Sequence, residues 1–177
     1  MSLKELTADL HTAAENTPFM KAVFAKTLPK KVWEEWTYWK TTFYHKIESK
    51  CAEGGLLDDL NGIQRAQLLF KDYTEMRDGD WHLPDNCTNP ALLAYLAYLD
   101  KLTPQQALGH LYTWHMGDMF GGQMIKKIVD APHNSLEFEN PRELMTNLRA
   151  KLTDDLAPEA RAAFEYAIKM MEAVYSE

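Results

Sequence analysis

The chain has 177 residues, of which 46% are hydrophobic and 25% charged, and its net charge is −7. This length and balance predict one well-packed domain over residues 1–177, and the acidic excess argues against general nucleic-acid binding. No stretch approaches the roughly 18 apolar residues of a membrane span, and the N-terminal segment lacks the apolar core of a secretion signal. We therefore expect a soluble cytoplasmic protein, monomeric and without a membrane partner. Its cysteines, Cys51 and Cys87, are expected as reduced thiols, with a disulfide or redox pair as the alternative.

Helical periodicity runs through almost the whole chain, and no sustained alternation indicates a strand. A first helix carries Leu3, Leu6, Leu10 and Ala14 on one face, and Thr17-Pro18 caps a short second one. The remaining predicted helices cover about 30–51, 62–76, 90–102, 103–130, a segment from 141, and 158–175. The long helix over 30–51 presents Val32, Trp36, Trp39, Phe43 and Ile47 on one face. The expected fold class is all-α, with about eight helices in an arrangement too irregular for a four-helix coiled coil.

The stretch HMGDMFGGQ, residues 115–123, places three glycines inside one of these predicted helices. Each glycine within a helix costs roughly 1 kcal/mol relative to alanine. Close helix packing would explain any one of them. However, Gly117 and Gly121 lie one turn apart on the same face, with Gly122 beside them. This cluster favours a bared backbone against something flat and rigid, such as a cofactor plane.

Asp118 lies among apolar neighbours in the same stretch, including Met116, Met119 and Phe120. An aspartate in the middle of a helix is more often solvated than functional. A carboxylate in apolar surroundings nevertheless needs hydrogen-bond partners or ordered water. We therefore expect Asp118 to overhang an apolar pocket and to tune a reactive ligand there.

The six histidines form no HxxxH or HExxH pair, so a zinc enzyme has little support. Glu15 follows His11 by one helical turn and could orient its imidazole through Nδ1. A neutral imidazole held in this way is a common proximal ligand of haem iron. The residues alone thus predict a flat pocket between two helices and favour haem weakly, while a structural or exposed role stays open for each histidine.

Two segments resemble the heme oxygenase family. LHTAAENTPFMK, residues 10–21, is similar to the family's proximal-helix motif, in which a histidine precedes T-x-A-E-N and then F-M. YTWHMGDMFGGQMIKKI, residues 112–128, is similar to the distal-helix motif with GD-x-x-GGQ and a lysine pair. The resemblance implies a heme-oxygenase-like helical domain that holds haem between a proximal N-terminal helix and a kinked distal helix.

Compared position by position, the resemblance implies which residues bind the iron and which lie against the haem plane. His11 matches the proximal iron ligand, and Glu15 matches the carboxylate that buttresses it. Gly117, Gly121 and Gly122 match the glycines at which the distal helix kinks over the haem.

The resemblance also implies a distal water network with Asp118 and Tyr44 as its catalytic residues. The chain departs from the family pattern at two positions. Trp114 stands where many members have an arginine of that network, and Phe120 stands where a small serine is common, above the expected haem plane. These departures bear on how the haem is seated and on which meso carbon is attacked.

A third implied group binds the haem propionates. Lys4 and Tyr112 match residues at this edge, and Arg142 aligns with the first basic residue of a C-terminal helix. The usual arginine one turn later is Thr146 here, so Arg149 on the same face is the predicted substitute.

The implied reaction is oxidative opening of haem b by O2 at a meso carbon, giving biliverdin (the IXα isomer is expected), CO and Fe2+. Haem is then both substrate and cofactor. An external donor such as a ferredoxin or a flavoprotein reductase would supply electrons, and a downstream bilin reductase is a candidate partner. Two alternatives remain: a non-catalytic haem carrier or sensor, and a thiaminase-type hydrolase of the same fold without haem. The second needs a nucleophilic cysteine, whereas Cys51 and Cys87 fall at a helix end and in a loop.

Overall fold

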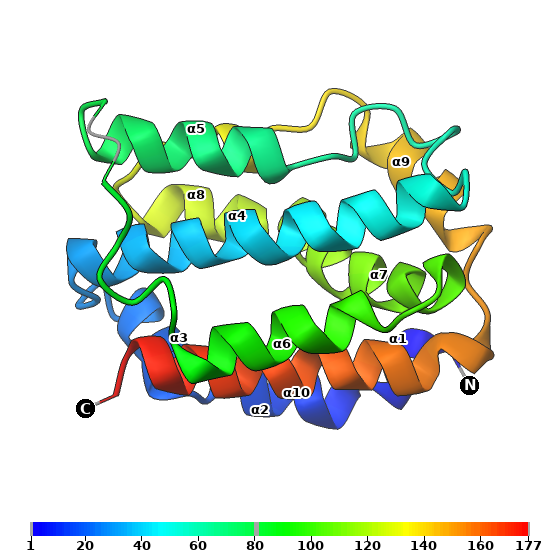
Figure 1. Cartoon of the computed structure of the whole chain (residues 1–177), viewed down its shortest axis with the longest axis horizontal. Coiled ribbons are helices and arrows are strands. Elements are labelled where there is room, and N and C mark those ends of the chain that lie inside the picture. The colour runs from blue at the N-terminus through cyan, green and yellow to red at the C-terminus, as the bar shows by residue number, and fades with distance from the viewer. Residues whose placement is uncertain (1, 80–81, 177) are drawn as a thin grey trace.

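A computed structural model describes residues 2–79 and 82–176 of the chain, and this part is all-α, as predicted (Figure 1). The α-helices in these ranges are α1 (Leu3–Leu6), α2 (Ala8–Glu15), α3 (Pro18–Phe24), α4 (Lys30–Glu53), α5 (Ala66–Met76), α6 (Pro90–Asp100), α7 (Pro104–Phe120), α8 (Gly122–Ile128), α9 (Pro141–Arg149) and α10 (Ala157–Val174). Two short 3-10 helices, η1 (Asn134–Leu136) and η2 (Asp154–Leu156), join them. The predicted irregular segment 77–90 includes residues 80 and 81, which lie outside the described residues. Within the described ranges, each helix is too short or too polar to traverse a bilayer.

Two of the eight predicted helices are each divided in the structure. Thr7 separates α1 from α2, and its hydroxyl donates to the Leu3 carbonyl at 2.8 Å. Gly121 separates α7 from α8. Periodicity did not predict either break, because both flanking segments keep their helical pattern.

The helix predicted from residue 62 begins only at Ala66. Gly62 has φ +86°, outside the helical region. The Glu48 carboxylate of α4 accepts the backbone N–H groups of Arg65 at 2.6 Å and Ala66 at 3.2 Å. A carboxylate from another helix therefore caps α5, and no local sequence signal predicts that start.

Two predicted caps are present. The Thr17 hydroxyl accepts the N–H of Met20 at 3.2 Å. Thr103 and Gln106 form a reciprocal capping box at the start of α7. The sequence therefore places the starts of α3 and α7 correctly.

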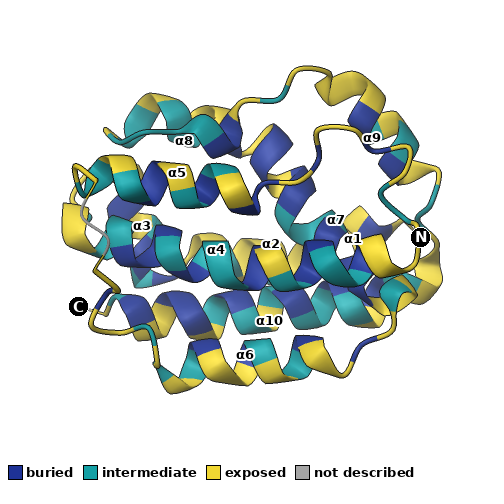
Figure 2. Cartoon of the chain, turned by 45° about the horizontal axis from the view of Figure 1, so that its top comes forward, coloured by how far each residue is buried: buried dark blue, intermediate teal, exposed yellow. Residues whose placement is uncertain are grey.

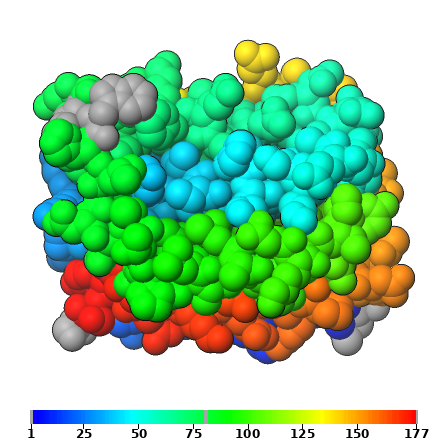
Figure 3. Space-filling view, viewed as in Figure 1, coloured from blue at the N-terminus to red at the C-terminus, as the bar shows by residue number. Residues whose placement is uncertain are grey.

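Helix α4 forms the centre of the core and contacts α5, α6 and α7. Trp36, Trp39, Phe43 and Ile47 of its predicted apolar face are buried, while Val32 is half-buried. Helix α10 packs against α7 and α6, and it also contacts the N-terminal helices α1, α2 and α3 (Figure 1). Buried and exposed residues alternate along the helices, as in amphipathic helices (Figure 2). On the face formed by α4, α5 and α6, the side chains pack into a continuous surface (Figure 3).

A buried hydrogen-bond chain fixes α7 between α6 and α10. The Trp114 indole N–H donates to Tyr95 Oη at 3.0 Å, and Tyr95 Oη lies 2.7 Å from His110 Nδ1. His110 Nε2 lies 2.9 Å from Glu159 Oε1, which also accepts the Tyr98 hydroxyl at 2.7 Å. This geometry fits a neutral His110 that accepts from Tyr95 and donates to Glu159.

At Gly109, α7 lies close against α10. A Cβ built there would lie 2.8 Å from Glu159 Cβ and 3.2 Å from the backbone atoms Ala160 N and Leu156 O. Gly109 is therefore a packing glycine, whereas a Cβ built at Gly117 would meet nothing within 4 Å.

We expect Gly109→Ala to lower the free energy of unfolding by about 1–3 kcal/mol, because α10 must shift to admit the methyl group. Gly117→Ala is the matched control on the same helix. It should leave stability unchanged or raise it by up to about 1 kcal/mol through helix propensity. Urea unfolding followed by circular dichroism measures both. Equal stability of Gly109→Ala and wild type would contradict this account.

Acidification should destabilise the fold through the His110–Glu159 pair. Burial lowers the pKa of His110 from its ordinary 6.5, and the hydrogen bond from His110 lowers the pKa of Glu159 from 4.5. The unfolded chain therefore takes up these protons first, and stability falls as pH drops below about 6.5 and again below about 4.5. We expect the melting temperature to decline from about pH 8 to about pH 5, with a smaller decline in His110→Gln. An equal decline in both proteins would exclude His110 as the cause.

Candidate functional site

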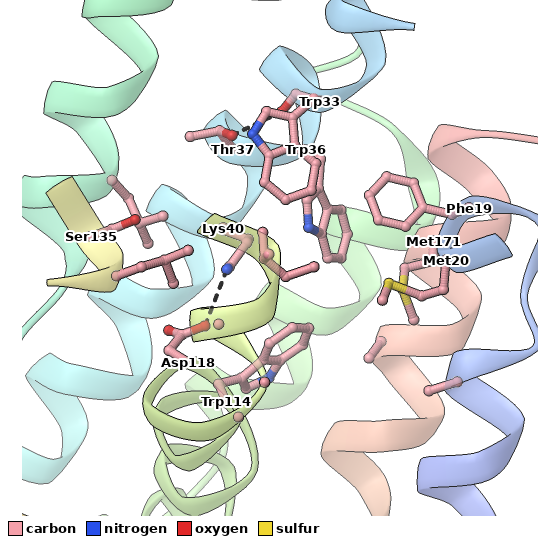
Figure 4. A pocket seen from close by; sticks show the side chains of 18 of the residues that line it. Phe19, Met20, Trp33, Trp36, Thr37, Lys40, Trp114, Asp118, Ser135 and Met171 are labelled. Atoms are coloured by element: carbon pink, nitrogen blue, oxygen red, sulfur yellow. Dashed lines mark hydrogen bonds and ion pairs between the residues drawn. The ribbon is translucent and has the colours of Figure 1, made fainter. Parts of the chain in front are cut away.

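A cavity opens between the N-terminal helices and the α7–α8 pair. It contains about 1200 Å³ of empty space, including open solvent at its mouth. Its wall draws on α2, α3, α4, α5, α7, α8, α10 and the segment 132–136. Phe19, Trp33 and Trp36 form an aromatic wall on one side, and Asp118 and Lys40 lie on another (Figure 4). Pockets of this kind, largely apolar with a few convergent polar groups, are typical of small-molecule and cofactor sites.

His11 and Glu15 line this cavity from α2. Glu15 Oε1 lies 3.1 Å from His11 Nδ1, and the two side chains are 62% and 51% exposed. So exposed a pair contributes little to stability, about 0–1 kcal/mol. Its effect is to orient the imidazole, with the proton favoured on Nδ1 and the lone pair on Nε2. Helix α2 has no buried residue, so its cavity-facing side is left uncovered by the protein.

Asp118 lines the cavity from α7 and is held by two side chains of α4. The Tyr44 hydroxyl donates to Oδ2 at 2.7 Å, and the Lys40 ammonium donates to Oδ1 at 3.4 Å. Tyr44 is fully buried and absent from the cavity wall, so it acts through Asp118. Burial and the neighbouring Asp118 charge raise the pKa of Tyr44 well above 10, so its hydroxyl stays protonated.

The three clustered glycines differ in their surroundings. All three line the cavity. Gly117 is exposed, with open space where a Cβ would lie, and a Cβ at Gly121 would approach only the Gly117 carbonyl oxygen, at 3.3 Å. A Cβ at Gly122 would lie 2.8 Å from Leu136 Cδ2, so this glycine admits η1. Two of the three therefore bare the helix backbone, while the third serves packing.

Tyr112, Phe120 and Arg149 lie close together outside the cavity wall. Burial raises the pKa of Tyr112, and the nearby charge of Arg149 opposes this rise. The Arg149 guanidinium lies 5.8 Å from the centre of the Phe120 ring. Phe120, which we expected above the haem plane, is 54% exposed and is not among the described residues that line the cavity. Its ring contacts Arg149 because it leaves α7 on the side that faces α9.

The other two residues predicted at the propionate edge, Lys4 and Arg142, are exposed on α1 and on the first turn of α9. Neither lines the cavity. Arg142 and Arg149 lie seven residues apart, which places them on one face of α9.

Sequence reasoning missed Lys40, which lines the cavity beside Asp118. A signal for it existed: Lys40 precedes Tyr44 by four residues, so the two side chains share one face of α4. The position of Phe164 and Met171 of α10 on the cavity wall had no such signal, because it depends on how α10 packs.

Two histidines of the 103–135 region differ in their surroundings. His115 is fully buried, and its Nε2 lies 2.7 Å from Glu48 Oε2. It does not line the described part of the cavity wall. His133 does line the cavity, and its Nε2 lies 2.7 Å from the Val129 carbonyl oxygen.

The cysteines do not fit the thiaminase-type alternative. Cys51 is fully buried, and burial raises the pKa of its thiol to about 12, so it is not a nucleophile at neutral pH. Neither Cys51 nor Cys87 belongs to the described wall of the cavity. Both are free thiols, as predicted.

Solved structures of other proteins share the all-α fold of this chain. A heme oxygenase from the cyanobacterium Synechocystis, solved in complex with heme, superposes with a TM-score of 0.83 at 22% identity, covering 96% of this chain and 89% of that one. A heme oxygenase from Leptospira interrogans superposes with a TM-score of 0.81 at 20% identity, covering 97% of this chain and 98% of that one. At these identities the likeness establishes the fold alone.

Sequence comparison gives the family. Heme oxygenase 2 of Oryctolagus cuniculus is 25% identical over 198 residues, which cover 95% of this chain and 63% of that protein. The chain thus spans less than two thirds of that relative's length. Heme oxygenase of Porphyra purpurea is 24% identical over 98% of this chain and 85% of its own length. The family model for heme oxygenase matches residues 1–173, nearly the whole chain, and the protein therefore belongs to the heme oxygenase family.

Proposed function

We propose that the protein is a haem-degrading oxygenase that opens haem b at a meso carbon, with O2 and external electrons, to biliverdin, CO and Fe2+. One observation carries the proposal: the His11–Glu15 pair and Asp118, which accepts the Tyr44 hydroxyl from behind the wall, line the same cavity from two different helices. A histidine is a common ligand of haem iron, and polar groups on the opposite side of the haem influence whether bound oxygen is activated.

The residues present fit a haem. The cavity is largely apolar and aromatic, α2 leaves its facing side uncovered, and Gly117 offers open backbone where a planar group needs close approach. His11 has Nδ1 turned to Glu15, and its Nε2 is the ring nitrogen suited to the iron. Bound haem would supply oxygen activation, and the protein would supply seating and electrostatics.

Asp118 is proposed as the distal group that orients water in the cavity. Tyr44 keeps its hydroxyl proton because its pKa is raised well above 10, so it remains a donor to Asp118 Oδ2. The carboxylate retains lone pairs that can accept hydrogen bonds from water in the cavity. Asp118 would thus orient water near the reacting face without acting as a strong acid.

The edge near α1 and α9 is proposed to receive the haem propionates. Lys4, Arg142 and Arg149 would supply positive charge there, and Tyr112 would supply a hydroxyl. Arginine and lysine pair well with carboxylates, so these side chains would set the rotation of the haem in its plane. That rotation selects the meso carbon, and the IXα isomer is the proposed product.

The protein's proposed partners follow from this reaction. Electrons would come from an external donor, a ferredoxin or a flavoprotein reductase, and a bilin reductase would consume the product. A monomer satisfies the proposal, because the cavity is built from one chain.

Adding hemin to the purified protein and then a reductant in air tests the proposal. We expect a Soret band of a histidine-ligated haem, followed by bilin absorbance with one dominant isomer on chromatography. A Soret band without bilin would favour the carrier or sensor. The absence of haem binding would exclude both.

His11→Ala should abolish the histidine-ligated haem spectrum, because Nε2 of His11 is the proposed iron ligand. Added imidazole should restore much of the spectrum by filling the vacated position. His133→Ala is the matched control, since His133 lines the same cavity. A normal spectrum in His11→Ala together with its loss in His133→Ala would transfer the ligand role to His133.

Asp118→Asn should bind haem with nearly normal affinity and yet form bilin at least about tenfold more slowly, a barrier increase of about 1.4 kcal/mol. The amide keeps the shape of the side chain but loses a charged acceptor for water. Single-turnover absorbance with a fixed reductant measures the rate. Bilin formation at the wild-type rate would contradict the proposed role of Asp118.

A further inference from the structure

The ammonium group of Lys40 lies on the cavity wall, and the proposed reaction gives it no role. Lys40 extends from α4 into the cavity toward Asp118 (Figure 4). Only 13% of its side chain is exposed. A charged group so far removed from water costs free energy unless its donors are satisfied.

The contacts of Lys40 within the described structure satisfy its ammonium only in part. Nζ lies 3.4 Å from Asp118 Oδ1, which is long for a charge-assisted bond, and 5.1 Å from the centre of the Tyr44 ring. An ammonium has three donors, and the hydrogen bonds of the described residues account for one of them. By contrast, Lys46 of the same helix binds Asp100 Oδ1 at 2.7 Å.

Other charged groups facing the cavity are already engaged. Both oxygens of Asp72 accept hydrogen bonds from the backbone and side chains of Asn134 and Ser135. Glu15 is paired with His11 at 3.1 Å. Lys40 is therefore the wall group best able to receive an additional anionic partner, and its apolar neighbours, such as Trp36 and Trp114, weaken dielectric screening there.

We propose that Lys40 is an anion-binding residue of the cavity, which takes up a small monoanion on the Asp118 side of the haem. The inference rests on the proposed function, because the haem iron provides the second contact of the anion. Asp118 opposes the effect of Lys40, so the two residues together set how much negative charge this side of the cavity accepts.

The proposal predicts opposite effects of two substitutions. Lys40→Met keeps much of the side-chain volume but removes the cation, and it leaves the Asp118 charge to repel an anion. Asp118→Asn removes that repulsion and keeps the cation. Lys40→Arg retains the charge and should retain binding.

The test is titration of the ferric haem complex with azide, an anion, and with imidazole, a neutral ligand, followed at the Soret band. Lys40→Met should weaken azide binding by about tenfold, equivalent to about 1.4 kcal/mol. Imidazole affinity should change by less than about twofold, because a neutral ligand gains little from the ammonium. Asp118→Asn should strengthen azide binding, and Lys46→Met, the matched control, should behave as wild type.

Two results would overturn the inference while leaving the proposed function intact: unchanged azide affinity in Lys40→Met, or an equal loss of azide and imidazole affinity, which indicates general damage to the cavity. If the wild-type protein forms no haem complex, both the proposed function and this inference fail.

Discussion

The crossing of α4 and α7 depends on two buried carboxylates, Asp118 and Glu48, which need hydrogen-bond partners within the protein. Tyr44 of α4 donates to Asp118 of α7, and His115 of α7 contacts Glu48 of α4 at 2.7 Å. The Tyr44 and His115 rings stack between these contacts with centroids 4.7 Å apart. Removal of the partner of a buried hydrogen-bonded group typically costs about 1–3 kcal/mol, and more when that group is charged. The same contacts that fix the crossing therefore also aim Asp118 at the cavity, so the stability of the fold and the geometry of the site share one set of residues.

The glycines of α7 and α8 show how one residue type serves both helix packing and the geometry of the cavity. Gly109 lets α10 approach α7, and Gly122 makes room for Leu136 of η1. A Cβ added at Gly117 would meet no atom within 4 Å, and the bare backbone of this residue lies on the cavity wall. Packing explains Gly109 and Gly122. Gly117 lowers helix stability in the same way, but no packing contact explains why a glycine is present there. The proposed haem would cover this backbone.

The sequence predicted local features well. The caps at Thr17 and Thr103 were correct because a cap depends on residues within one turn of it. The apparent start of α5 at residue 62 was wrong because the true cap is Glu48, from another helix. The i,i+4 spacing of His11 and Glu15 correctly predicted that their side chains meet. The position of Phe120 could not be predicted in this way, because it depends on Arg149 of α9, which lies beside it.

By itself the sequence determined the all-α class, most helix boundaries, the paired His11 and Glu15, and the glycine–aspartate stretch that marks the heme oxygenase family. The resemblance had implied a network of Asp118 with Tyr44, but the tertiary structure alone showed the direct Tyr44 contact and the presence of Lys40. Tyr44 and Lys40, the partners of Asp118, are 74 and 78 residues away in the chain. Periodicity specifies which face of a helix is apolar, but contacts over such separations follow from how the helices pack, and packing is set by the shapes of all the side chains together.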